Sequence, residues 1–178
     1  MDNGTFVTAG LVLRETETKE SDKILTVLTP ELGRISVIAK GARSRRSKYT
    51  AACQLLAYDE MTLRRKGEWY YLAEASTIEL FDGVRQDIEK LALKDDVLRR
   101  ANGFYTYLCQ DAMAAADMLP LLLNALFALG MLEKPNRLVK TAFVWRLLAE
   151  AGFAPLADGC AVCGRESPEA PMLDVMQG

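Results

Sequence analysis

Residues 23–40 read KILTVLTPELGRISVIAK, and this stretch decides the fold. Its first part, Lys23–Leu28, is apolar and β-branched, as in a strand that is buried on both faces. Residues 29–33 (Thr-Pro-Glu-Leu-Gly) have the length and the residue types of a hairpin turn. In residues 34–40 two sets of side chains alternate, apolar Ile35, Val37 and Ala39 with Arg34, Ser36, Ile38 and Lys40. The stretch therefore predicts a hairpin whose second strand has one apolar face and one largely basic face.

Three more strands are expected around this hairpin. Residues 5–13 are apolar with threonine and valine, residues 61–66 alternate, and residues 69–80 follow a turn at Gly67-Glu68. Five strands that close on themselves within about eighty residues indicate a small barrel. Residues 40–57 lie between the third and fourth strands, where an OB-fold places its loop and short helix. We therefore predict an OB-fold barrel in residues 1–80.

The next part of the chain has the composition of helices. Residues 84–93 and 95–108 are expected to form two of them, with Asp95-Asp96 as an exposed helix start. Asp117 is a plausible N-cap for a third helix, with Pro120 in its first turn. The clearest helix is residues 137–151, with Pro135 before it and Gly152 as its C-terminal cap. The predicted fold class is α+β, with residues 81–178 forming a helical domain that includes a zinc-ribbon-like Cys-x2-Cys element.

Composition excludes several classes of enzyme. The 178 residues include no histidine, which rules out Ser-His-Asp and Cys-His catalysis and histidine-ligated zinc. No glycine pattern resembles a nucleotide-binding loop. The net charge is −2, so a nucleic-acid partner must be sought in the distribution of charge rather than in its sum. The expected protein is not an enzyme.

The sequence indicates a cytoplasmic protein. The N-terminal residues MDNGTFVTAG lack the basic and apolar regions of a signal peptide. The longest apolar stretch, residues 118–132, is interrupted and too short to span a bilayer. Four cysteines without a secretion signal suggest reduced thiols or metal ligands.

A basic run is the main candidate binding feature. Between Arg34 and Lys48 there is no acidic residue, and the run has six cations: Arg34, Lys40, Arg43, Arg45, Arg46 and Lys48. A second cluster on a predicted strand comprises Arg64, Arg65 and Lys66. Such cations release counterions from a nucleic-acid backbone and give affinity without sequence specificity. The alternative is a solvated loop with no ligand.

Five aromatic residues near these cations have two interpretations. They could stack on bases, or they could fill the core of the barrel. The five are Tyr49, Tyr58, Trp69, Tyr70 and Tyr71.

Cys160 and Cys163, followed by Gly164, form half of a zinc knuckle. A tetrahedral site needs four ligands, and the chain ends 15 residues after Cys163, near the place of a second pair. The chain is therefore expected either to end before that pair or to carry an unmetallated first pair. A redox Cys-x2-Cys is less favoured because no βαβ context surrounds it. Cys53 and Cys109 are expected in the core.

The helical half offers another possible site. An amphipathic or acidic-apolar peptide could dock on it, with cations to bind carboxylates, namely Arg99, Arg100, Arg137 and Lys140. Ordinary core packing is the simpler explanation of its apolar residues.

At this point the chain resembles a known family. The segments are Glu20–Thr29, Glu31–Arg34 and Ala39–Arg43, then Ala73-Glu74 at the barrel closure. Later segments are Ala142–Leu148, Gly152–Pro155 and Cys160-x2-Cys163-Gly164. In this order and spacing they resemble the RecO family of bacterial recombination mediators over nearly the whole chain.

The resemblance implies an OB-fold, a helical domain and a zinc-binding element. It implies binding to single- and double-stranded DNA, annealing of complementary strands, and work with RecR to load RecA. The DNA concerned is coated by single-stranded-DNA-binding protein, whose C-terminal tail is a further partner. By position, the backbone contacts are Lys40, Arg43, Arg45, Arg46 and Lys48, and the zinc ligands are Cys160 and Cys163.

Two other functions remain open from the residues alone. The barrel could be an RNA-binding module in translation or decay, which a comparison of DNA and RNA affinity would test. The chain could also be a protein-interaction scaffold whose basic loop is incidental, in which case DNA binding would be absent or independent of salt.

Overall fold

The computed structural model describes residues 4–18, 21–85, 88–107, 112–154, 159–160, 162–167 and 169. Five strands form a closed barrel in the order β1-β2-β3-β5-β4. Their bounds are β1 Thr5–Thr18, β2 Asp22–Thr29, β3 Gly33–Ala39, β4 Tyr58–Lys66 and β5 Trp69–Glu79. All neighbouring strands are antiparallel except β3 and β5. This is the five-stranded Greek-key arrangement of an OB-fold, so the predicted OB-fold barrel is confirmed.

The hairpin at residues 23–40 forms as predicted. Val27 lies opposite Ile35 and Leu25 opposite Val37, and all four side chains are buried. Gly33 closes the turn with a φ of 67°, a left-handed conformation that glycine adopts at little cost. The hydroxyl of Thr29 donates to the carbonyl of Gly33 at 3.0 Å. The apolar face of β3 thus fills the barrel, and its basic face is left outside.

The segment between β3 and β4 consists of hydrogen-bonded turns, and no helix is assigned within residues 40–57, all of which are described. Two bonds tie its start to the β1–β2 connection. The Gly41 N–H donates to Asp22 Oδ1 at 2.8 Å, and the Arg43 N–H donates to the Ser21 carbonyl at 3.0 Å. The beginning of the basic segment is therefore fixed to the barrel.

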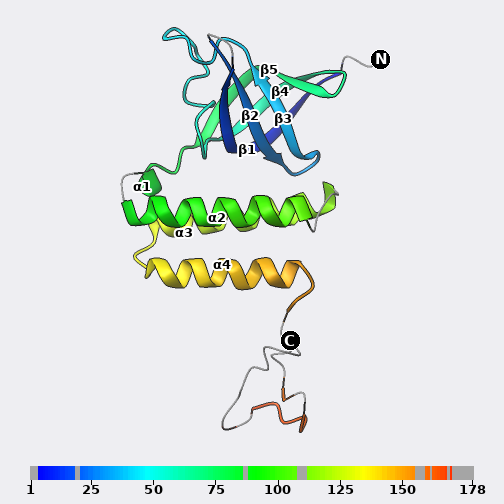
Figure 1. Cartoon of the computed structure of the whole chain (residues 1–178), viewed down its shortest axis with the longest axis vertical. Coiled ribbons are helices and arrows are strands. Elements are labelled where there is room, and N and C mark those ends of the chain that lie inside the picture. The colour runs from blue at the N-terminus through cyan, green and yellow to red at the C-terminus, as the bar shows by residue number, and fades with distance from the viewer. Residues whose placement is uncertain are drawn as a thin grey trace.

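Four helices follow: α1 Asp82–Arg85, α2 Ile88–Tyr107, α3 Ala112–Met131 and α4 Asn136–Glu150. Figure 1 shows the barrel on one side of α2 and α3, and α4 on the other. α3 contacts both the barrel and α4. Within the described residues, none of the helices combines the length and the hydropathy needed to cross a bilayer.

Two groups of buried side chains hold the molecule together. One fills the barrel and includes Leu25, Val37 and Leu63. The other joins Leu28 of the barrel to Leu122 of α3 and Phe143 of α4. Because this second core crosses from barrel to helices, the two parts pack on each other.

Two predicted helix starts are wrong. Residues 84–93 and 95–108 are not separate helices, because α2 runs through Asp95-Asp96. Asp96 is half-buried and is bonded to three cations, so its charge is tolerated inside a helix. Asp117 is not an N-cap either, since α3 begins at Ala112 and Pro120 lies within it. Proline lacks the backbone N–H, so the helix gives up one hydrogen bond there.

The last helix matches its prediction closely. α4 follows Pro135 and ends where Gly152 adopts a φ of 85°. The N–H of Gly152 donates to the Ala149 carbonyl at 3.0 Å, and the Phe153 N–H donates to the Leu148 carbonyl at 2.9 Å. This pair of bonds satisfies carbonyls at the helix end.

Candidate nucleic-acid interface

One residue of the first basic cluster, Lys40, meets the second basic cluster on the outside of the barrel. Ile38 of β3 lies opposite Tyr71 of β5, and Tyr71 lies opposite Arg64 of β4. Lys40, just after β3, and Arg64, near the end of β4, therefore flank β5 from its two sides. They share a hollow of about 600 Å³ lined by Thr5, Lys40, Arg64, Arg65, Lys66, Tyr71, Leu72 and Ala73. We call this hollow the Lys40–Tyr71 groove.

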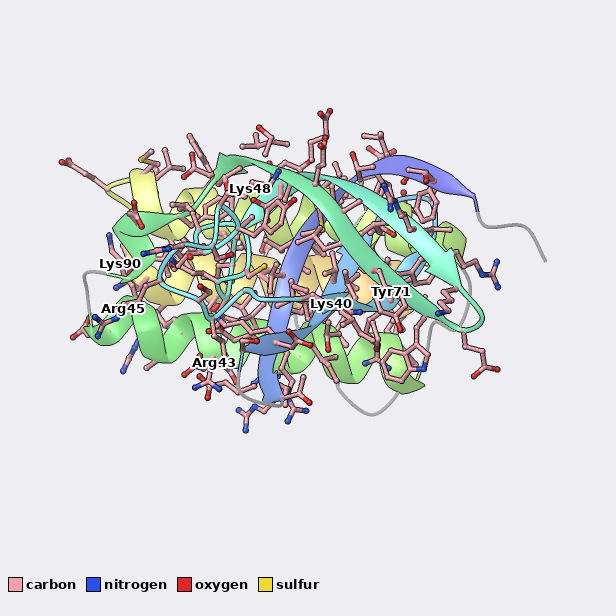
Figure 2. The ribbon with its side chains drawn as sticks, turned by 90° about the horizontal axis from the view of Figure 1, so that it is seen from above. Lys40, Arg43, Arg45, Lys48, Tyr71 and Lys90 are labelled. Carbon is pink, nitrogen blue, oxygen red and sulfur yellow. The ribbon has the colours of Figure 1, made fainter. Side chains whose placement is uncertain are left out.

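The groove is positive and open to water. The ammonium of Lys40 lies 5.6 Å from the centre of the Tyr71 ring, and the guanidinium of Arg65 lies 6.0 Å from that of Tyr70. These are cation–π distances, so the rings help to position the cations. Figure 2 shows Lys40 beside Tyr71. No carboxylate is among the described residues that line the groove. The arrangement suits a phosphate next to an aromatic or sugar ring.

The rest of the basic run does not enter the groove. Figure 2 shows Arg43, Arg45 and Lys48 leaving the 40–57 segment on different sides. Arg43 Nη2 lies 3.0 Å from Glu17 Oε2, and the Lys48 ammonium lies 5.0 Å from the centre of the Tyr49 ring. Arg45 and Arg46 are exposed. In this view the three labelled cations lie on the side of Lys40 that is away from Tyr71, so they do not form one patch with the groove.

Arg34 lies at the other end of β3. It shares a second hollow of about 490 Å³, lined by Arg14, Thr26, Arg34, Ile35 and Ser36. Arg14 was not predicted as a site residue, because β1 was expected to end at Leu13 and in fact continues to Thr18. The sequence signal that could have found it is the position of Arg14 directly after the apolar residues 11–13.

The aromatic residues divide between the two interpretations. Tyr49 and Tyr70 pack against the barrel core, and Tyr58 packs against the core shared with the helices. The hydroxyl of Tyr49 donates to the Ala73 carbonyl at 2.5 Å. Trp69 is 44% exposed, and Tyr71 belongs to neither core. Only these last two remain candidates for stacking on bases.

The cysteines differ in environment. Cys53 is fully buried in the barrel, as predicted, and burial raises the pKa of its thiol to about 11. Cys109 lies outside the described residues. The Cys160–Gly164 turn is closed by a 2.8 Å bond from the Gly164 N–H to the Cys160 carbonyl. The N–H groups of Cys163 and Val162 lower the pKa of Cys160, which favours the thiolate that binds metal.

This turn fits half of a zinc site. Two cysteines that are close together on a tight glycine turn are the usual first pair of ligands. Across the described residues no three histidine, cysteine or acidic side chains gather to hold an ion. The zinc-ribbon part of the prediction therefore stays a prediction.

Three of the four cations expected to bind a peptide bind within the chain. Asp96 accepts bonds from Arg99 at 2.7 Å, from Lys140 at 2.8 Å and from Arg100 at 3.0 Å. These partners, with Lys140 contributing most, hold the pKa of Asp96 well below its ordinary value. The cluster joins α2 to α4. Arg137 is exposed at the start of α4.

Comparison with known proteins agrees with both parts of this fold. The family model for the recombination protein O N terminal matches residues 1–81, and that for the recombination protein O C terminal matches residues 105–174. DNA repair protein RecO of Acetivibrio thermocellus is 32% identical over 157 residues, covering 88% of this chain and 61% of the relative. That of Caldicellulosiruptor bescii is 33% identical over 159 residues, covering 89% and 63%. The chain thus spans less than two thirds of the length of these curated relatives.

Proposed function

The chain belongs to the RecO family of DNA repair proteins, and on that premise we propose that it binds DNA as a recombination mediator through the Lys40–Tyr71 groove. One observation carries this proposal. Lys40 and the cluster at residues 64–66, which are far apart in the sequence, line one positive hollow. The family's role in DNA repair favours DNA over the RNA-binding module and the scaffold that the sequence left open.

In this proposal the groove binds the backbone of one strand. Lys40, Arg64 and Lys66 displace the counterions that are condensed on the phosphates, and the release of these ions supplies most of the affinity. The other cations of the 40–57 segment lower the repulsion that a second, complementary strand meets as it approaches. The strands then pair through their own bases. No covalent bond is made or broken, so the protein acts as a mediator and not as an enzyme.

The partners follow from the family resemblance. We propose that the chain works with RecR to load RecA onto DNA coated by single-stranded-DNA-binding protein, whose acidic tail docks on the helices. Of the four cations predicted to bind this tail, Arg99, Arg100 and Lys140 are bound to Asp96. Among the described residues no ion pair is seen for the fourth, Arg137, so we propose that Arg137 binds a carboxylate of the tail. We propose that the protein acts in the cytoplasm, at the nucleoid, where a DNA repair protein meets its substrate.

Zinc is a separate proposal. Cys160 and Cys163 would supply two thiolate ligands, and zinc would stabilise the fold of the C-terminal segment rather than take part in a reaction. Zinc content measured after dialysis, in the chain and in a Cys160→Ser/Cys163→Ser variant, tests this. Equal zinc in both would contradict it.

Annealing of complementary fluorescent oligonucleotides tests the function. The groove variant is Lys40→Gln/Arg64→Gln/Lys66→Gln. The matched control removes three exposed cations from the helical half, namely Lys134→Gln/Arg137→Gln/Arg146→Gln. We expect the groove variant to anneal at least tenfold more slowly than the wild type and the control to retain its rate. Equal rates in all three proteins, or no annealing by the wild type, would reject the proposal.

A further inference from the structure

The outer side of α4 is apolar although it does not belong to the core. The inner side of this helix packs into the molecule through Phe143 and Leu147, which are buried. Three large apolar side chains nevertheless face solvent, since Leu138 is 57% exposed and Trp145 and Leu148 are each 42% exposed. Figure 1 shows α4 with α2 and α3 on one side of it only. A helix that is apolar on both sides is usually covered on both sides.

The outer side of α4 also has little need of water. With 3.6 residues per turn, six positions share this side of the helix, and none of them is charged. They are Leu138, Thr141, Ala142, Trp145, Leu148 and Ala149, and we call them the α4 face. The hydroxyl of Thr141 donates to the Arg137 carbonyl at 2.8 Å, so its hydrogen bond is made within the helix.

Phe153 extends this surface beyond the end of the helix. Its N–H donates to the Leu148 carbonyl, and the Gly152 N–H donates to the Ala149 carbonyl. These are the two bonds of a Schellman turn, in which the residue after the glycine commonly contacts the side chain five positions before it. That contact brings Phe153 beside Leu148. Because Phe153 is 66% exposed, its ring lengthens the apolar surface at the C-terminal end of α4.

The exposed area is close to that of a subunit interface. An aromatic side chain has about 150–250 Å² of surface, so the exposed parts of Leu138, Trp145, Leu148 and Phe153 together amount to about 400 Å². A specific interface buries about 800 Å² on each partner, and roughly 56–65% of this area is apolar. The methyl groups of Ala142 and Ala149 add to the four large side chains. The α4 face therefore has about the apolar area that one partner of a dimer contributes.

From the area and the residue pattern of this face, we propose that it binds the same face of a second copy of the chain, with the two α4 helices antiparallel. A twofold axis level with residues 143–144 sets Trp145 against Ala142 of the second copy and Leu138 against Ala149 of the second copy. Leu148 then lies near Thr141 of the second copy. Each large side chain meets a small one, as in close helix packing. A parallel pair would instead set Trp145 against Trp145.

A second copy suits this face better than an acidic peptide does. The face itself carries no cation, and Arg137 and Arg146 lie at its edges. A twofold pair uses one patch on both chains and closes at two, so no apolar surface is left for further copies. The tail that we assign to Arg137 would compete with the second copy for part of α4. The inference goes beyond the proposed DNA binding, which does not depend on it.

Sedimentation equilibrium of the full chain without DNA, at about 1–200 µM, covers the affinity of a weak interface. The average mass of the wild type should rise from one chain to two and no further. Trp145→Glu places a charge in the middle of the pair and should stay a single chain at the highest concentration. Val7→Glu, which changes an exposed apolar side chain of β1, is the matched control and should associate as the wild type does. Circular dichroism checks that each variant folds.

A second variant separates a specific pair from general stickiness. Ala142→Leu makes the α4 face more apolar but fills the space that Trp145 of the second copy takes. It should weaken association about tenfold or more, as overpacking does, whereas unchanged or tighter association would overturn the antiparallel pairing. A wild type that stays a single chain at the highest concentration, or that grows beyond two chains, would overturn the inference without any variant.

Discussion

Replacing Asp59 by asparagine should stabilise the protein at neutral pH. Asp59 is fully buried at the start of β4, and neither of its carboxylate oxygens has a hydrogen-bond partner among the described residues. Burial disfavours the charged form and outweighs the opposing effect of Thr77 on the facing strand, so it raises the pKa of Asp59 from 3.8 to about 6. At pH 7.5 the native carboxyl is thus ionised at a cost that the unfolded chain does not bear.

The magnitude follows from that pKa. A rise of about two pH units, at about 1.4 kcal/mol each, corresponds to about 3 kcal/mol. An acid whose folded pKa is raised destabilises the fold above that pKa, and the penalty disappears as the pH falls toward the unfolded value near 3.9. The free energy of unfolding of Asp59→Asn should therefore exceed that of the wild type by about 3 kcal/mol at pH 7.5. This difference should be smaller at pH 6 and nearly zero at pH 4.

Urea unfolding followed by circular dichroism at pH 4, 5, 6, 7 and 7.5 measures this difference. Glu60→Gln, at the exposed neighbouring position, is the control and should show no such trend. A difference between Asp59→Asn and the wild type that stays constant from pH 4 to pH 7.5 would refute the reasoning, because it could not come from the ionisation of Asp59.

Three further predictions concern packing and charge. Asp96→Asn should lower the free energy of unfolding by about 1–2 kcal/mol at pH 7, because it weakens three charged bonds that solvent partly screens. The control Glu133→Gln, at an exposed site, should leave urea unfolding unchanged. An equal loss of stability in both variants would argue against a stabilising role of the Asp96 cluster. Gly83→Ala should destabilise the protein by about 1–3 kcal/mol, since a Cβ there would lie 2.6 Å from the Gly130 carbonyl oxygen. Gly130→Ala should cost less, because the nearest contact of its Cβ is a Val84 methyl at 3.4 Å. A larger loss of melting temperature in Gly130→Ala than in Gly83→Ala would contradict this close approach of α1 to α3. Arg43→Ala/Arg45→Ala/Arg46→Ala should weaken binding to DNA of every sequence and reduce the slope of log affinity against log salt. The reduction should be less than about one slope unit per residue, because Arg43 is already paired with Glu17. An unchanged slope would show that this segment does not contact phosphates.

The strands and the last helix could be predicted because their signals are local. The alternation of residues 34–40 and the turn before them determine the hairpin, and the proline and glycine around α4 mark its ends. Asp95-Asp96 misled the helix prediction because Lys140, which stabilises Asp96 together with two near neighbours, is on another helix. A single-sequence pattern holds no information on such a partner.

The candidate site was predicted only in pieces. Lys40 and the cluster at residues 64–66 were both named, but nothing in the sequence states that β3 and β5 pair in parallel and bring them to one groove. The aromatic run at residues 69–71 has no alternation, so which ring faces outward depends on the register with β4. That register places Tyr70 inside and Tyr71 outside.

The salt dependence of DNA affinity tests the central claim most directly. The measurement is the slope of log affinity against log salt for oligo(dT), for the wild type, for Lys40→Gln/Arg64→Gln/Lys66→Gln and for the control Lys134→Gln/Arg137→Gln/Arg146→Gln. Each phosphate contact on a single strand contributes about 0.7 to this slope. The groove variant should therefore lose about 2 slope units, and the control should lose none. Equal slopes for the groove variant and the wild type would contradict the account.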